Sequence, residues 1–270
     1  MQTNETPQLA PPWFLGSPGR EIPSTTGIKF VSDLHANLFD DTHIATFETI
    51  SRGFNDSHII WGGDTINLDL PHPNSQVLEA FAHIAGANLK SQTVLGGNHD
   101  PRTLLEYLFK QRDSAAQVFS HTFVQREEAN PVLFMHGDRI NPLNVLGGLS
   151  FWKKASHRFG HVIDNAINGN RTARVLAVIP QLIQTFTYRR FLASQTDAVV
   201  GHTHWPTVKV FPNGRRLIIS GCGYGDTLNG ADGELYFHAV DVPPKGALAF
   251  EKWRVDEQIH DIELIDRNEI

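Results

Sequence analysis

Five short apolar runs, each closed by glycine or by a polar side chain, constrain the fold of this chain more than any other feature. They lie at residues 28–31, 58–61, 93–95, 131–135 and 198–200. Runs of this length, bounded by turn residues, are typical of buried β-strands. Between the first three runs, residues 44–50 and 75–87 carry apolar side chains at the spacing of a helix. This alternation predicts an α/β layered fold with largely parallel central strands.

The later part of the chain changes character. Asp100 followed by Pro101 predicts the start of a further helix, with Asp100 as its N-cap rather than as a metal ligand. From about residue 144 to 195 the pattern is mainly helical. Further strands are then predicted at 207–211, 216–220, 235–240 and 247–255, separated by turns.

Composition sets limits on the class of protein. Hydrophobic residues make up 40% of the 270 residues and charged residues 19%, as in an ordinary globular domain. Cys222 is the single cysteine, which excludes an internal disulfide and a cysteine-built metal site. Residues 1–27 contain five prolines and no long apolar run, so we expect an extended tail without a signal peptide or membrane span. We therefore expect a cytoplasmic protein with one domain at 28–270.

Potential metal ligands stand at the end of each of the five runs. They are Asp33, His35, Asp64, Asn98, His99, His136, His202 and His204. The carboxyl ends of strands line the ligand crevice in layered α/β folds, so these side chains should converge. Any one of them alone would be explained as a turn residue or a structural histidine. Their recurrence at five strand ends favours a metal site, and oxygen and imidazole ligands without thiolate suit Mn²⁺, Zn²⁺ or Fe.

The ordered motifs Asp33-x-His35, Gly63-Asp64, Gly97-Asn98-His99-Asp100, His136 and Gly201-His202-x-His204 resemble the calcineurin-like metallophosphoesterase superfamily. The resemblance spans roughly residues 28–223. It implies a four-layer α/β/β/α sandwich with two divalent metal ions, with Mn²⁺ expected and Zn²⁺ or Fe as alternatives. The resemblance assigns one ion to Asp33, His35, Asp64 and His204, and the other to Asp64, Asn98, His136 and His202, with Asp64 as the bridge.

Such a site has a clear chemistry. Two cations about 3.5–4 Å apart clamp the attacking and leaving oxygens of an in-line displacement and generate a water-derived nucleophile near neutral pH. His99 is the predicted catalytic residue, which protonates the leaving oxygen. Many relatives place an aspartate beside this histidine, three residues after the bridging aspartate, where this chain has Asn67. An asparagine can orient an imidazole but supplies no charge to raise its pKa.

A basic helical insertion is predicted at about residues 143–195. It contains seven lysines and arginines and one acidic residue, which gives the segment a net charge of +6. Because the net charge of the whole chain is −6, the remaining residues sum to −12. We interpret it as a lid that attracts an anionic substrate, with a solvated helical face as the alternative. Its position resembles the insertion of bacterial pyrophosphatases that act on UDP-diacylglucosamine, which usually carry arginine where His99 stands.

The sequence thus predicts an enzyme, a metal-dependent phosphoric ester hydrolase. Its substrate would be a small anionic phosphomonoester, phosphodiester or pyrophosphate. The alternatives are a nucleotide-lipid pyrophosphatase of the UDP-diacylglucosamine type, a metal-dependent nuclease and a non-catalytic binding scaffold. The net charge of −6 argues against stable binding of nucleic acid. Scaffolds on this fold lose ligands, whereas every ligand position of this chain is filled.

Overall fold

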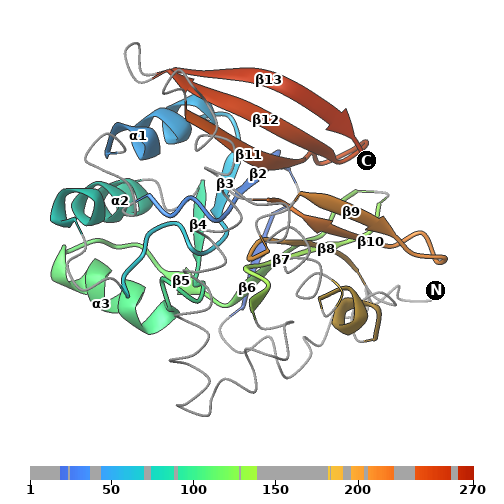
Figure 1. Cartoon of the computed structure of the whole chain (residues 1–270), viewed down its shortest axis with the longest axis horizontal. Helices are drawn as coiled ribbons and strands as arrows, with labels where there is room; N and C mark the ends of the chain where they lie inside the picture. The colour runs from blue at the N-terminus through green and yellow to red at the C-terminus, as the bar shows by residue number, and fades with distance from the viewer. Residues whose placement is uncertain are drawn as a thin grey trace, which may run out of the picture.

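The computed structural model describes most of the chain outside the N-terminal tail and the insertion. The described residues are 19–23, 25–36, 44–69, 74–87, 91–127, 129–138, 182, 184–190, 196–203, 206–221, 235–256 and 261–270. Two mixed sheets and their covering helices make up the molecule (Figure 1). Within the described residues, no helix combines the length and the hydropathy needed to cross a bilayer.

The first sheet, called sheet B, has seven strands in the described chain, in the order β13-β12-β11-β2-β3-β4-β5. The strands are β2 (Ile28–Val31), β3 (His58–Trp61), β4 (Gln92–Leu95), β5 (Val118–Phe119), β11 (Leu235–Val242), β12 (Ala249–Asp256) and β13 (Asp261–Glu269). Strands β2 to β5 are parallel neighbours, whereas β11, β12 and β13 pair antiparallel. The parallel half of the sheet therefore brings the carboxyl ends of four strands to one edge.

The second sheet, called sheet A, has six strands in the described chain, in the order β1-β6-β7-β8-β10-β9. The strands are β1 (Gly19–Ile22), β6 (His121–Val124), β7 (Val132–Met135), β8 (Asp197–Val200), β9 (Thr207–Val210) and β10 (Arg216–Ile219). At its centre β7 and β8 are parallel, with Met135 opposite Val200. The ends of these two strands thus lie side by side.

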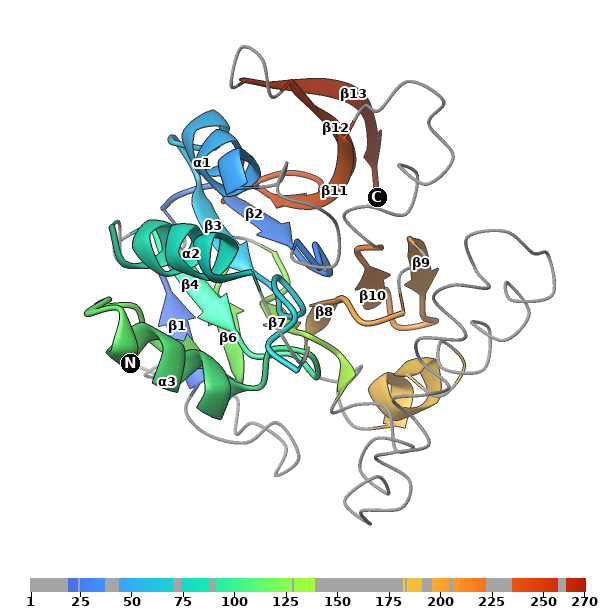
Figure 2. The ribbon, with the colours of Figure 1, turned by 60° about the vertical axis from the view of Figure 1, so that its left-hand side comes forward.

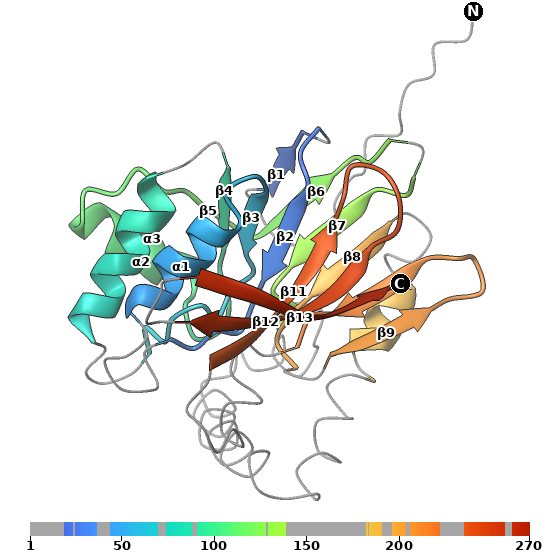
Figure 3. The same ribbon diagram turned by 90° about the horizontal axis from the view of Figure 1, so that it is seen from above.

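The predicted four-layer α/β/β/α sandwich is confirmed (Figure 3). Helices α1 (Ile44–Gly53), α2 (Ser75–Ala87) and α3 (Arg102–Gln111) lie along sheet B, whose outer face carries Ile59 and Trp61 into the same apolar cluster as α1 and α2. Alternate residues such as Phe30 and Phe134 fill the space between the two sheets. Helical residues 184–190 contribute Tyr188 to a third cluster on the outer face of sheet A.

Most predicted elements are present. The strands that precede the predicted ligands, the first two helices and the later strands occur where the apolar patterns placed them. Strands β1, β5, β6 and β13 were not predicted. Of these, β1 lies within the segment 1–27, expected to be a tail, and pairs in parallel with β6. Residues 1–18 and most of the insertion predicted at 143–195 lie outside the described residues.

Candidate metal centre

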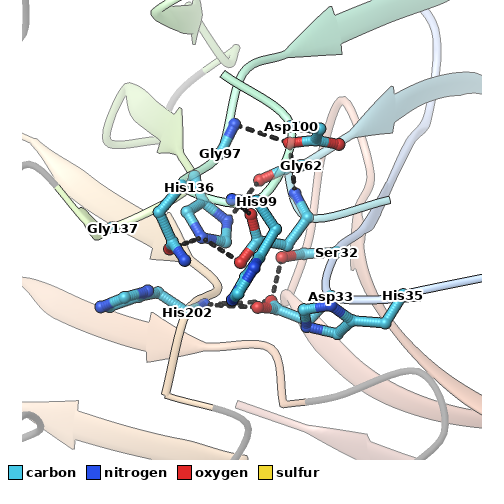
Figure 4. A network of polar contacts seen from close by, with 12 residues as sticks. Ser32, Asp33, His35, Gly62, Gly97, His99, Asp100, His136, Gly137 and His202 are labelled. Carbon is cyan, nitrogen blue, oxygen red and sulfur yellow. Dashed lines mark hydrogen bonds and ion pairs between the residues drawn. The ribbon is translucent and has the colours of Figure 1, made fainter. Parts of the chain in front are cut away.

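The predicted ligands of the described chain all follow the carboxyl ends of central strands. Asp33 and His35 follow β2, Asp64 follows β3, and Asn98 and His99 follow β4. His136 and His202 follow the neighbouring strands β7 and β8 of the other sheet. Figure 4 shows side chains from both sheets converging on one place. Convergence at a crevice beyond the strand ends is what the parallel arrangement predicts.

The backbone at this place is unusual. Asp33, His35, Asp64 and His202 have φ angles of 57°, 47°, 50° and 77°, in the left-handed region that residues other than glycine rarely adopt. Hydrogen bonds between loops hold this conformation: Asp33 N donates to Gly63 O at 3.0 Å, and His35 N donates to Asp64 O at 2.9 Å. Strained backbone that surrounding structure enforces is concentrated at functional sites.

The side chains form two groups with the dimensions of metal sites. Asp33, His35 and Asp64 make the first group, and Asp64, His136 and His202 make the second; within each group the possible ligand atoms lie within 4.8 Å of one another. Asp64 belongs to both groups. Asp33, Asp64 and His136 are almost fully buried, so no layer of water screens their charges.

The charges of the two groups are strongly coupled. Burial disfavours the charged form of Asp64, yet His136, His99 and His35 hold the pKa of its carboxyl well below its usual range. Burial likewise disfavours a charged His136, but the Asp64 and Asp33 carboxylates raise the pKa of its imidazole well above its usual value. Buried carboxylates that favour a protonated imidazole beside them would also stabilise a bound cation at this place.

Asn98 lies with the second group. Its Oδ1 is 3.0 Å from His136 Nε2, and the same nitrogen is 3.1 Å from Asp64 Oδ2. The other ring nitrogen of His136, Nδ1, lies 3.2 Å from Gly62 O, which fixes the orientation of the ring. An amide oxygen, a carboxylate oxygen and a ring nitrogen therefore converge, and this donor set fits a divalent cation. The last predicted ligand, His204, lies outside the described residues.

His99, the predicted acid, has a carboxylate partner that the sequence analysis missed. His99 Nδ1 lies 2.9 Å from Asp69 Oδ2, while His99 N donates to Asp64 Oδ1 at 2.8 Å. Asn67 instead pairs with His35, whose Nδ1 is 2.8 Å from Asn67 Oδ1. Many relatives have an aspartate three residues after the bridging aspartate. In this chain the carboxylate beside His99 belongs instead to Asp69, five residues after Asp64. Both polar residues lie on the loop after β3, and their spacing alone does not reveal which imidazole each one reaches.

Asp100 was expected to cap α3, and this prediction is wrong. The helix begins at Arg102 after Pro101 and has no side-chain cap. The Asp100 carboxylate instead accepts hydrogen bonds from Asp64 N and Thr65 N, both at 2.8 Å, and from Gly97 N at 2.9 Å. It therefore clamps the loop that carries Asp64. Burial and the neighbouring Asp64 charge raise the pKa of Asp100 to about 8.

Two of the glycines in the motifs leave room for ligands. A Cβ added to Gly97 would overlap the Asp64 carboxylate, and one added to Gly201 would overlap Ser32 and Asp33. Ser32 donates a short hydrogen bond to Asp33, and His202 N donates to the same carboxylate at 3.0 Å. The glycines thus allow loops of both sheets to approach the acidic ligands closely.

Solved structures are similar to this chain only at low sequence identity and with low TM-scores. A predicted phosphoesterase from Streptococcus pneumoniae TIGR4 is 14% identical with a TM-score of 0.38, over 91% of this chain and 97% of that chain. Vps29 of Chaetomium thermophilum is 10% identical with a TM-score of 0.38, over 92% and 96%. A cold-active protein-tyrosine phosphatase of a psychrophilic Shewanella species is 13% identical with a TM-score of 0.39, over 95% and 85%.

A search of curated proteins finds none that matches. The model of one protein family, described as calcineurin-like phosphoesterase, matches residues 27–221. That range holds every predicted ligand from Asp33 to His204 and covers well over half of the chain. The chain therefore belongs to the calcineurin-like phosphoesterase family.

Proposed function

We propose that this protein is a phosphoesterase with a dinuclear metal centre, and that Asp64 bridges the two ions. One observation carries the proposal: the Asp64 carboxylate is shared between two compact groups of ligands, one from sheet B alone and one that joins both sheets. A single metal site needs one such group. A carboxylate with two oxygens, held between two sets of imidazoles, is suited to two cations.

The proposed ligands divide as follows. Asp33, His35 and Asp64 hold the first ion together with His204, and Asp64, Asn98, His136 and His202 hold the second. Mn²⁺ is the preferred ion for this oxygen and imidazole set, with Zn²⁺ or Fe as alternatives. When bound, such ions neutralise charge on the phosphoryl oxygens and supply a nucleophile at neutral pH. The chain itself positions that chemistry through the strained loops.

His99 is proposed to protonate the leaving oxygen of the ester. Its side chain is at the rim of the site, about one sixth exposed, with its ring edge against His35 at 5.3 Å between ring centroids. Asp69 engages Nδ1, so Nε2 is the nitrogen that we propose protonates the leaving group. The Asp69 carboxylate also favours the protonated imidazole that a general acid requires.

The substrate is proposed to be a small anionic phosphomonoester, phosphodiester or pyrophosphate. The support is the charge distribution: a segment of +6 in sequence lies between His136 and His202, in a chain that is otherwise acidic. Positive charge near a cleft raises the local concentration of an anionic substrate. No contact among the described residues distinguishes a monoester from a diester or a pyrophosphate.

The test is a metal-dependent hydrolysis assay. Protein stripped of metal is assayed with Mn²⁺ on p-nitrophenyl phosphate and on bis(p-nitrophenyl) phosphate, followed by nucleotide-sugar pyrophosphates and DNA. We expect turnover that requires Mn²⁺ and is lost in Asp64→Asn, which preserves the shape of the bridging residue. Mn²⁺ binding without hydrolysis of any of these substrates would contradict the proposal and would support a binding scaffold.

A further inference from the structure

The helical segment at residues 184–190 is fixed to the back of sheet A by one buried side chain. Tyr188 is fully buried and packs in the cluster that contains Met135 and Val200, the last residues of β7 and β8. Its hydroxyl donates to Thr196 O at 2.7 Å. Phe186, two residues earlier, is 69% exposed, so the helix turns one face to the sheet and the other away from it.

Gln184 lies one helical turn before Tyr188 and therefore on the same face. It is fully buried, and its Nε2 donates to Gly137 O at 3.2 Å. Gly137 follows His136 directly and has a φ of 103°, and a Cβ added there would come within 2.9 Å of Gln184 Nε2. The amide of Gln184 thus fills the space beside the turn that carries His136.

This turn connects the two strand ends of the second ligand group. Gly201 N donates to His136 O at 2.9 Å, which ties the His136 turn to the loop that carries His202. On its other side His136 reaches Asp64 and Asn98. A residue that fixes the carbonyl of Gly137 therefore acts one residue away from a proposed ligand and next to the hydrogen bond that links the His136 turn to the His202 loop.

Gln184 is poorly suited to a purely structural role. Its Oε1 is buried and accepts no hydrogen bond within the described part of the chain. A buried amide that is half satisfied costs free energy, whereas an apolar side chain of equal length would fill the same space without that cost. The hydrogen bond from Gln184 Nε2 to Gly137 O gives the amide a role that an apolar side chain could not fill.

We propose that Gln184 is a positioning residue for the ligand group of Asp64, His136 and His202. The proposal rests on the dinuclear centre proposed above. Gln184 acts on the turn that carries His136 through its hydrogen bond to Gly137. One of the two cation positions then depends on Gln184, and the position of Asp33 and His35 does not.

The experiment uses Gln184→Met, which keeps the length of the side chain and removes its donor. Metal-free full-length protein is titrated with Mn²⁺ and followed by calorimetry. For the unchanged protein we expect two binding steps. In Gln184→Met one step weakens by about 10- to 100-fold, the usual effect of removing a partner that orients a metal ligand. The other step stays unchanged, which also shows that the variant is folded.

Tyr188→Phe is the matched control, because it removes a buried hydrogen bond from the same helix without touching the His136 turn. It should lower thermal stability and leave both Mn²⁺ affinities unchanged. The inference is overturned if Gln184→Met leaves both steps intact, if both steps weaken alike, or if Tyr188→Phe weakens the same step as strongly. If the unchanged protein binds no Mn²⁺, the proposed dinuclear function fails first and this inference fails with it.

Discussion

Asn67 and Asp69, two residues apart on the loop after β3, serve two different imidazoles. Asn67 Oδ1 accepts from His35 Nδ1, so Nε2 is the nitrogen that would face a cation. Asp69 pairs with His99, where a negative charge stabilises the protonated ring. A neutral partner fits a metal ligand, and a charged partner fits a general acid. The pairing therefore supports the different roles proposed for the two histidines.

Removal of the charge at residue 69 should affect chemistry and leave metal binding intact. In Asp69→Asn the orienting contact survives, but the protonated form of His99 loses its stabilisation. We expect turnover of esters with poor leaving groups to fall, by at most the 10²- to 10⁴-fold that a general acid contributes. Activated p-nitrophenyl esters should be much less affected. Turnover numbers are compared across a series of leaving groups, and an equal fall along the whole series would contradict the role of His99.

Removal of the amide at residue 67 should instead weaken metal binding. Asn67→Ala frees the ring of His35 to rotate, and we expect Mn²⁺ affinity to fall about 10- to 100-fold. Asn74→Ala is the control, since the Asn74 side chain accepts from Gln76 N at the start of α2, away from the site. Calorimetric titration of both variants makes the comparison. An equal loss of affinity in Asn74→Ala would show that the effect reflects general destabilisation.

At the scale of elements, the sequence predicted the strands that carry the ligands because their patterns are strong. Strands β3, β7 and β8 are buried along their whole length and read as continuous apolar runs. Strands β1, β5, β6 and β13 were missed. Three of these, β1, β5 and β13, lie at sheet edges, where β1 has one buried residue and β13 is exposed almost throughout. Their membership in the sheets depends on pairing with partners distant in sequence, which no local pattern records.

The loops between elements were the harder problem. Convergence of the ligands could be predicted, because parallel strands bring their carboxyl ends to one edge. The partners of Asp69, Asp100 and Gln184 could not, since each contact joins residues about 30 or more positions apart and depends on the path of a loop. Local sequence likewise predicted that Asp100 caps a helix. In the structure its carboxylate accepts hydrogen bonds from the backbone of the Asp64 loop instead.

Close packing of these loops predicts the effect of a small change at Gly97. In Gly97→Ala the new methyl group overlaps the Asp64 carboxylate and presses on Asp100. We expect a loss of stability of about 1–3 kcal/mol, as for overpacked sites, together with weaker Mn²⁺ binding. Gly27→Ala is the control, because its Cβ meets only Ser57 at an ordinary 3.9 Å. Urea unfolding measures both variants, and similar stabilities would contradict the predicted overlap.

At the scale of the whole molecule, the site joins the two sheets drawn in Figure 2, since its ligands follow strands of both. Sheet B supplies Asp33, His35 and Asp64, and sheet A supplies His136 and His202. Apolar contacts such as that between Phe30 and Phe134, at 5.7 Å between ring centroids, hold the sheets together behind the site. Cations bound at the site would add links between the same two sheets, so metal binding and global stability should be coupled.

This coupling predicts a rise in the unfolding temperature with metal. A ligand that binds only the folded state at 100 times its dissociation constant stabilises that state by about 2.7 kcal/mol. For a domain of this size each kcal/mol corresponds to about 2–4 °C, so Mn²⁺ should raise the melting temperature by roughly 5–10 °C and a chelator should reverse the rise.

In Asp64→Asn the rise should largely disappear, because both ligand groups lose their shared carboxylate. The metal-free form of this variant should melt lower than the unchanged protein, since His136, His99 and His35 favour the charged Asp64 carboxylate in the folded state. A rise of equal size in Asp64→Asn, measured by differential scanning calorimetry, would place the stabilising ion elsewhere on the surface and would contradict a metal-linked pair of sheets.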